Sequence, residues 1–158
     1  MHLISRLAFA APPDRVFAMV TDETFLAHAA TELGSADPRV AASATRTAVE
    51  GAIETPAEIR AFVGPSLTIT QETVWSGPAP DGSREGTVTL TVATTPVSLT
   101  GTATLAPAPG GSTLTYSGDL VVKVPLLGGR LETLAAPNVT EAFEAQGRVG
   151  ADWLATHQ

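Results

Sequence analysis

The last third of the sequence joins an apolar strand pattern, ending at Val122, to the longest helical pattern of the chain, Gly128 to Thr156. A chain that is otherwise rich in strand patterns must bury the apolar side of such a helix against its sheet. A sheet that curves around one helix commonly leaves a cavity between the two. The sequence therefore predicts an α+β domain in which a curved antiparallel sheet of six to seven strands wraps around a long C-terminal helix.

Alternating residues define the strands in the second half of the chain. Four strands are expected, separated by turns rich in Pro and Gly, at Leu67 to Trp75, Gly86 to Ala93, Val97 to Leu105 and Thr113 to Val122. Side chains of alternate residues point to opposite faces of a sheet. The apolar set is expected inside and the threonine columns in solvent; the inward set is Val88, Leu90, Val92, Leu99, Leu114, Tyr116 and Leu120.

The N-terminal half predicts a first strand, His2 to Ala10, followed by two short helices. The first helix opens at Pro12-Pro13-Asp14, and Asp22 caps the second, which extends to about Ala30. A weak strand is expected over Arg39 to Glu50, turned at Gly51 into a short partner over Ala52 to Glu54. A short helix over Ala57 to Val63 follows.

Small and apolar residues recur at helical spacing in the final helix. The predicted apolar stripe contains Leu127, Leu131, Leu134, Ala142, Phe143, Val149, Trp153 and Leu154. Pro137 lacks a backbone N–H, so a kink or break is expected near Ala136, with Asn138 capping the helix that restarts.

Length and composition limit the class of protein. A chain of 158 residues is expected to form one domain, residues 1–158. It has no apolar run long enough for a membrane span and no signal-peptide pattern, so a cytoplasmic location is expected. Cysteine is absent, and a net charge of −7 with only nine Lys and Arg argues against a nucleic-acid partner.

The sequence holds no recognised catalytic or metal-binding spacing. His2, His28 and His157 are far apart and lack the spacing of metal ligands, so no metal and no cofactor are expected. Glu132, at the start of the long helix, is the one carboxylate considered for catalysis, because partial burial would raise its pKa toward that of a general acid. The favoured interpretation is that it complements the helix N-terminus or pairs with Arg130.

Several stretches resemble a known superfamily. Ala11-Pro12-Pro13-Asp14-Arg15-Val16-Phe17 is similar to the first-helix signature of the START-like, helix-grip (SRPBCC, Bet v 1-like) superfamily, which includes lipid-transfer domains and polyketide aromatases/cyclases. Thr95-Pro96-Val97, Tyr116-Ser117-Gly118 and the run from Val124 to Glu132 resemble an uncharacterised bacterial branch of it, of the DUF2505 type. The resemblance implies the helix-grip fold and a tendency to hold apolar ligands, and it transfers no catalytic residue.

Three functions remain open from the sequence. The first is a non-enzymatic binding or carrier protein for an apolar or amphipathic small molecule, of lipid or polycyclic type, in an internal cavity. The second is a polyketide cyclase/aromatase-like enzyme, and the third is a protein-association module with a filled core. No catalytic residue is predicted; the expected ligand-binding residues are Trp75, Leu90, Leu99, Tyr116, Leu131, Glu132, Leu134 and Phe143.

Overall fold

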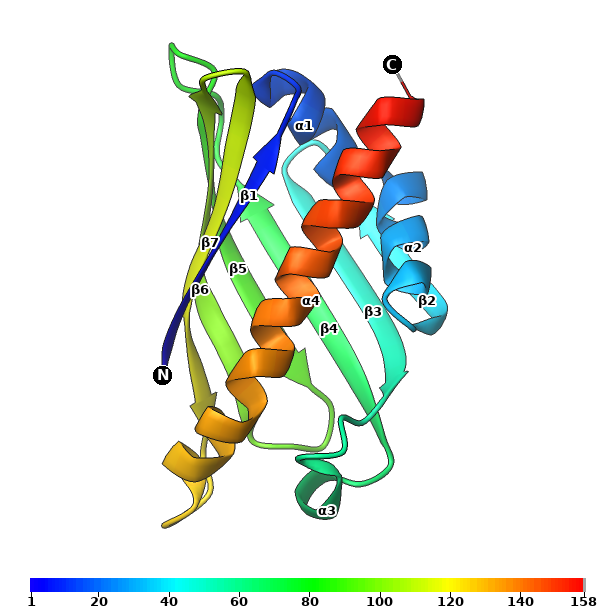
Figure 1. Cartoon of the computed structure of the whole chain (residues 1–158), viewed down its shortest axis with the longest axis vertical. Coiled ribbons are helices and arrows are strands. Elements are labelled where there is room, and N and C mark those ends of the chain that lie inside the picture. Colours follow the sequence, from blue (N-terminus) through cyan, green and yellow to red (C-terminus); the bar gives the residue numbers. More distant parts are fainter. Residues whose placement is uncertain (158) are drawn as a thin grey trace.

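The structure is a computed structural model that describes residues 1–157. In chain order its elements are β1 (His2–Phe9), α1 (Pro13–Val20), α2 (Glu23–Glu32), β2 (Ala36–Ala42), β3 (Arg46–Glu54), α3 (Arg60–Val63), β4 (Ser66–Trp75), β5 (Arg84–Val92), β6 (Val97–Ala108), β7 (Gly111–Val122) and α4 (Gly128–Thr156). The strands form one antiparallel sheet in the order β1-β7-β6-β5-β4-β3-β2. Figure 1 shows the sheet curving around α4, with α1 and α2 beside the C-terminal half of that helix. The predicted α+β architecture is confirmed.

The inward and outward faces follow the predicted alternation. Val88, Leu99, Leu114 and Leu120 are buried against the helix side of the sheet, whereas Thr87, Thr91 and Thr100 on the other face are exposed. Each inward aliphatic side chain stabilises the fold by roughly 1.5–3 kcal/mol through removal of apolar surface from water. The sheet's concave face is therefore the core, and any ligand site inside it must share space with that core.

The region between α2 and α3 differs from the prediction. Two strands, β2 and β3, replace the single strand expected over Arg39 to Glu50, and they are joined by a tight turn at Ser43. The Ser43 backbone N–H donates to the Arg46 carbonyl (2.8 Å), and the Ser43 hydroxyl oxygen accepts from the Arg46 N–H (3.1 Å). A serine turn of this kind carries no Gly or Pro signal, which is why the sequence pattern missed it.

Gly51 lies inside β3, so the turn predicted there is wrong. The Ser35 side chain packs directly against its Cα and occupies the position that a β-carbon would take. This glycine is therefore needed for close approach between β3 and the residue that precedes β2, not for a reversal of the chain.

The long helix continues through Pro137, so of the kink or break predicted near Ala136 the break is wrong, and Asn138 does not cap a new helix. Pro137 is exposed, as is Thr133 one turn earlier, so the Thr133 carbonyl that loses its partner lies on the solvent side. Buried Ala135 and Ala136 hold the same turn against the sheet. Leu127, expected in the apolar stripe, is instead exposed at the helix N-cap position.

The two N-terminal helices form where the sequence predicts them. Pro13 begins α1, and the Asp22 carboxylate caps α2 by accepting the Thr24 backbone N–H at 2.8 Å. Their buried residues, including Val16, Val20 and Phe25, close one end of the space under α4. No helix within residues 1–157 combines the length and apolar character needed to cross a membrane.

Candidate functional site

A cavity of about 190 Å³ lies between the sheet and the two helices α2 and α4. Its walls come from α1 and α2, from strands β3, β4, β5 and β7, and from the middle of α4. The lining residues are Val20, Leu26, Ala29, Ala30, Leu33, Ser35, Thr47, Val49, Gly51, Ile53, Ile69, Gln71, Thr73, Trp75, Leu90, Tyr116, Ala142 and Gln146. The small side chains of Ala29, Ala30 and Ala142 leave the space that larger residues on these helices would fill.

Polarity changes along the cavity because of the register between β3 and β4. Thr47 is paired with Thr73, Val49 with Gln71 and Gly51 with Ile69, running away from α1. The end nearest α1 therefore presents hydroxyl and amide groups, whereas the other end presents the aliphatic Ile53 and Ile69 together with the Ser35 hydroxyl, which packs against Gly51. We refer to these two ends as the polar half and the apolar half.

The polar half is the better enclosed of the two. Val20, Leu26 and Trp75 close it, and all three are buried, Trp75 with only 4% of its surface exposed. Ala142 and Leu33 are exposed where α4 and the C-terminal end of α2 border the cavity. A small molecule would thus enter between α2 and α4 and reach the threonines last.

Trp75 forms a wall of the cavity at the end of β4. The Phe17 ring packs edge-on against it with centroids 5.5 Å apart, and the Arg84 guanidinium lies 3.7 Å from the Phe17 ring centroid. These contacts join α1, β4 and β5 and fix the orientation of the indole. The Trp75 Nε1 atom is buried and has no hydrogen-bond partner within the described residues.

Tyr116 contributes a neutral phenol to the cavity wall. Burial raises its pKa to about 12, because the phenolate would lose its hydration, and an interaction with the Gln146 side chain opposes part of this shift. The Tyr116 ring also stacks on Phe143 of α4. At neutral pH Tyr116 can donate or accept a hydrogen bond, and it carries no charge.

The predicted ligand-binding residues are divided among three places. Trp75, Leu90 and Tyr116 line the main cavity. Leu99 and Phe143, again with Tyr116, border a space of only about 10 Å³, and Leu131 borders an apolar space of about 50 Å³ near α3. Leu134 is half-buried and lines none of the three, and neither does Glu132.

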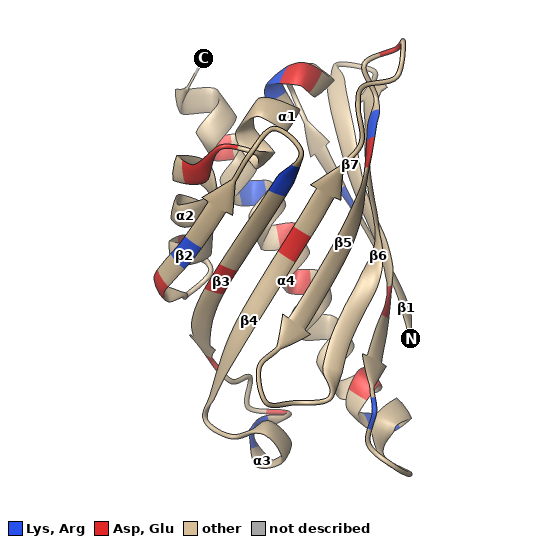
Figure 2. Cartoon of the chain, turned by 180° about the vertical axis from the view of Figure 1, so that it is seen from behind, with Lys and Arg blue, Asp and Glu red and all other residues tan. Residues whose placement is uncertain are grey.

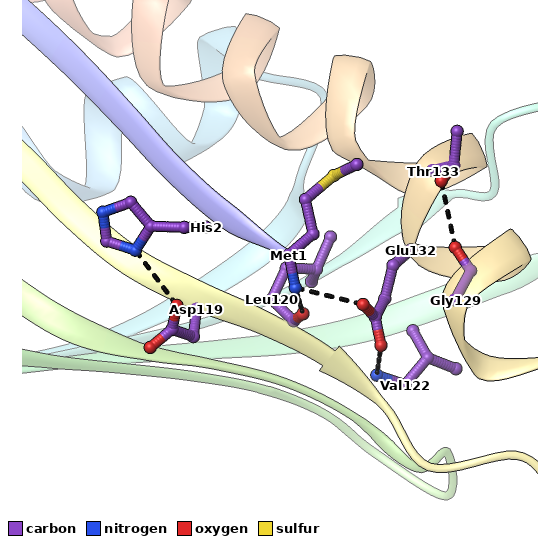
Figure 3. Close-up of polar contacts among 8 residues, drawn as sticks. All are labelled: Met1, His2, Asp119, Leu120, Val122, Gly129, Glu132 and Thr133. Carbon is purple, nitrogen blue, oxygen red and sulfur yellow. Dashed lines mark hydrogen bonds and ion pairs between the residues drawn. The ribbon is translucent and has the colours of Figure 1, made fainter.

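Glu132 takes part in a structural contact at the start of α4 (Figure 3). Its carboxylate accepts the Val122 backbone N–H at 3.1 Å and lies 3.0 Å from the Met1 amine. These two contacts, the Val122 hydrogen bond first, lower the pKa of Glu132. A lowered pKa is the opposite of what the general-acid hypothesis needs. Of the two alternatives, complementing the helix N-terminus or pairing with Arg130, the second is wrong, because the carboxylate contacts Met1 and Val122.

Five polar residues that line the cavity were not predicted from the sequence: Ser35, Thr47, Gln71, Thr73 and Gln146. One signal was present, because Leu67, Ile69, Gln71, Thr73 and Trp75 alternate onto one face of β4. A glutamine and a threonine on an otherwise apolar inward face indicate that polar groups are needed in the interior of the domain. Gln146 gave no such signal, since helix spacing alone does not show which surface of α4 faces the cavity.

The histidines lie apart from the cavity lining. His2 contacts Asp119 at the surface (3.0 Å), and His157 stacks on Trp153 at the end of α4. Within residues 1–157 no three His, Cys, Asp or Glu side chains are grouped so that they could hold a metal ion. Figure 2, seen toward the outer face of the sheet, shows Lys and Arg as isolated positions interspersed with Asp and Glu.

Known proteins share this fold. The protein TTHA0849 from Thermus thermophilus superposes with a TM-score of 0.69 at 17% identity and full coverage of both chains. Norcoclaurine synthase from Thalictrum flavum, solved in complex with dopamine and hydroxybenzaldehyde, gives 0.62 at 13% identity, covering 100% of this chain and 88% of that one. Ara h 8.0201 gives 0.60 at 11% identity, with 96% and 98% covered.

Sequence comparison identifies the family. The Uncharacterized protein Rv0481c of Mycobacterium tuberculosis is 31% identical over 90 residues, which are 56% of this chain and 51% of that protein. The chain thus aligns with about half the length of this relative. The sequence model of the family described as Protein of unknown function (DUF2505) matches residues 5–154. The chain therefore belongs to the DUF2505 family, and it shares its fold with the three solved structures named above.

Proposed function

We propose that this protein binds or carries an apolar or amphipathic small molecule in the cavity between the sheet and helices α2 and α4. The observation that supports the proposal is the 190 Å³ cavity itself, lined mainly by aliphatic and aromatic side chains with a few polar groups. Ligand sites in proteins have this composition. An apolar cavity of about 150 Å³ already accommodates benzene.

The lining favours binding over catalysis. None of the eighteen lining residues is Asp, Glu, Lys, Arg or His, the side chains that most often transfer protons in enzymes. Tyr116, with its raised pKa, is a poor acid at neutral pH. A cyclase or aromatase reaction would need convergent acids and bases, which this lining does not supply.

The open space also weighs against a role based on a filled core. Natural cores contain few voids larger than a water molecule. A cavity of this size costs stability, so a role in ligand binding gives a physical reason for its retention. Norcoclaurine synthase, which shares the fold, was solved with two small molecules bound, which further supports ligand binding by this fold. The cytoplasmic location and the single domain stay predictions from the sequence.

Tryptophan fluorescence provides the test. Trp75 lines the cavity, whereas Trp153 stacks on His157 with ring centroids 3.7 Å apart and is not among the lining residues. A Trp153→Phe variant leaves Trp75 as the only tryptophan of the chain. We expect saturable, low-micromolar quenching of this variant by at least one compound of a small apolar panel. A linear response to every compound would contradict the proposal.

A further inference from the structure

The division of the cavity into a closed polar half and a more open apolar half restricts what it can hold. We propose, on the basis of the binding function proposed above, that the ligand is an uncharged, single-ring or similarly small amphiphile that enters with its polar group first. That group would be an amide, carbonyl or hydroxyl, hydrogen-bonded by residues of β3 and β4. The ligand's apolar part would remain between Ile53 and Ile69.

The register of the sheet supports the position of the polar group. Thr47 and Thr73 are direct cross-strand partners, and both are buried. Gln71 is the inward-facing residue that precedes Thr73 on β4, and Gln146 faces the same cavity from α4. Threonine hydroxyls and glutamine amides both donate and accept hydrogen bonds. They therefore suit a ligand group that does the same.

The absence of charge in the lining supports a neutral ligand. A carboxylate or ammonium group moved into the closed half would leave water without meeting an opposite charge among the eighteen lining residues. Such a transfer is strongly unfavourable, and an uncharged polar group that keeps its hydrogen bonds avoids most of that cost. A neutral head group is thus preferred over a charged one of the same shape.

The size of the cavity supports a small ligand. The cavity has a volume of about 190 Å³, whereas a cavity of roughly 150 Å³ accommodates benzene. The difference is about the volume of one or two small substituents on the ring. Long-chain lipids and polycyclic compounds are larger than this space. The structure thus narrows the lipid or polycyclic ligand expected from the sequence to a compact one.

Three probes of matched shape test the inference. para-Toluamide carries a neutral amide, para-toluate replaces the amide by a charged carboxylate, and para-xylene replaces it by a methyl group. Affinities are measured by quenching of Trp75 in the Trp153→Phe variant and checked by calorimetry. We expect para-toluamide to bind about tenfold more tightly than either of the others, as one or two net hydrogen bonds would give.

Substitutions identify the side chains that cause the preference for para-toluamide. In Gln71→Leu and in Thr73→Val the preference for para-toluamide over para-xylene should fall several-fold, while in Thr87→Val, on the exposed outer face of β5, it should be unchanged. The ratio of two affinities is measured on the same folded protein, so a general loss of stability does not imitate the effect. Circular dichroism confirms that each variant is folded.

Each outcome has a distinct meaning. If para-xylene binds as tightly as para-toluamide, the polar half of the cavity does not favour ligands with a polar group. The inference is then overturned, although the proposed binding function stands. Equal binding of para-toluate overturns the requirement for a neutral ligand. If none of the three probes binds, yet a larger apolar compound does, the size argument is wrong. Failure of every compound refutes the proposed function together with the inference.

Discussion

The phenol ring of Tyr116 on β7 stacks on the ring of Phe143 on α4, with centroids 4.6 Å apart and planes inclined by 28°. This pair connects the long helix to β7, the neighbour of the edge strand β1, beside the cavity. Stacked aromatic pairs contribute roughly 0.5–1.5 kcal/mol beyond the burial of their area. The contact sets the distance between α4 and the sheet next to the cavity.

Tyr116 should titrate at unusually alkaline pH. Burial raises its pKa to about 12, whereas an exposed tyrosine in the unfolded chain titrates near pH 10. Between these values the unfolded chain gives up a proton that the folded protein keeps, so the free energy of unfolding should fall as the pH rises. Tyr116 is the only tyrosine of the chain, so tyrosinate absorbance reports it directly. A midpoint near pH 10 in the folded protein would contradict its burial, and Tyr116→Phe should weaken the alkaline loss of stability.

Truncation of Phe143 should be severely destabilising. Phe143→Ala removes a buried aromatic side chain, at an expected cost of about 3 to 5 kcal/mol in the free energy of unfolding. Thr89→Lys, on the outer face of β5, should change it by no more than about 1 kcal/mol. Denaturant unfolding measures both. Equal stability of wild type and Phe143→Ala would show that this side of α4 is not in the core.

A large side chain at the cavity opening should abolish binding without unfolding the protein. Ala142 lines the cavity and is exposed, so Ala142→Phe should occupy the opening at little cost in stability. Ala151→Phe, at an exposed position of α4 outside the lining, is the matched control. The measurement is quenching of Trp75 by any compound that binds the Trp153→Phe protein. Unchanged binding in Ala142→Phe would move the ligand site elsewhere.

Glu132 should stabilise the protein in a pH-dependent way. Because its pKa is lowered in the folded state, its contribution is present above the ordinary carboxyl pKa and is lost as the pH falls through the folded value. Glu132→Gln should therefore be less stable than wild type at neutral pH, and the difference should shrink in acid. Glu50→Gln, at an exposed site, controls for the loss of one negative charge. A difference that is constant with pH would contradict the contacts to Val122 and Met1.

Leu126 should tolerate glycine unusually well. It is fully exposed, at 104% of its reference area, and its backbone has φ +67°, where a leucine side chain costs about 1–2 kcal/mol. Glycine relieves that strain, but it also increases the conformational entropy of the unfolded chain. This entropy cancels about 0.4–1 kcal/mol of the stabilisation gained. We expect Leu126→Gly to raise the free energy of unfolding by roughly 0.5 to 1 kcal/mol. Leu126→Ala removes the same side chain without relieving the strain and should have almost no effect.

Short-range patterns in the sequence were sufficient for most of the fold. The alternation around Val88 and Leu114, the cap at Asp22 and the long apolar helix from Gly128 each depend on neighbours within a few residues. Local sequence therefore specified the elements, and the need to bury one face of each determined the class of fold. Trp75, Leu90 and Tyr116 were placed near the helix side of the sheet for the same reason.

The remaining features depend on contacts between residues that are distant in the sequence. Gly51 could be assigned as a close-approach residue only once Ser35 was placed against it, and the partners of Glu132 became known only when β1 and β7 met the start of α4. The polar half of the cavity needs the register that pairs Thr47 with Thr73 and the rotation of α4 that turns Gln146 toward them. Local periodicity fixes neither register nor helix rotation, because both are selected by packing over the whole domain. The sequence by itself determined that an antiparallel sheet wraps around the C-terminal helix. Tertiary packing decided where a cavity remains between the sheet and the helices, and which side chains line that cavity.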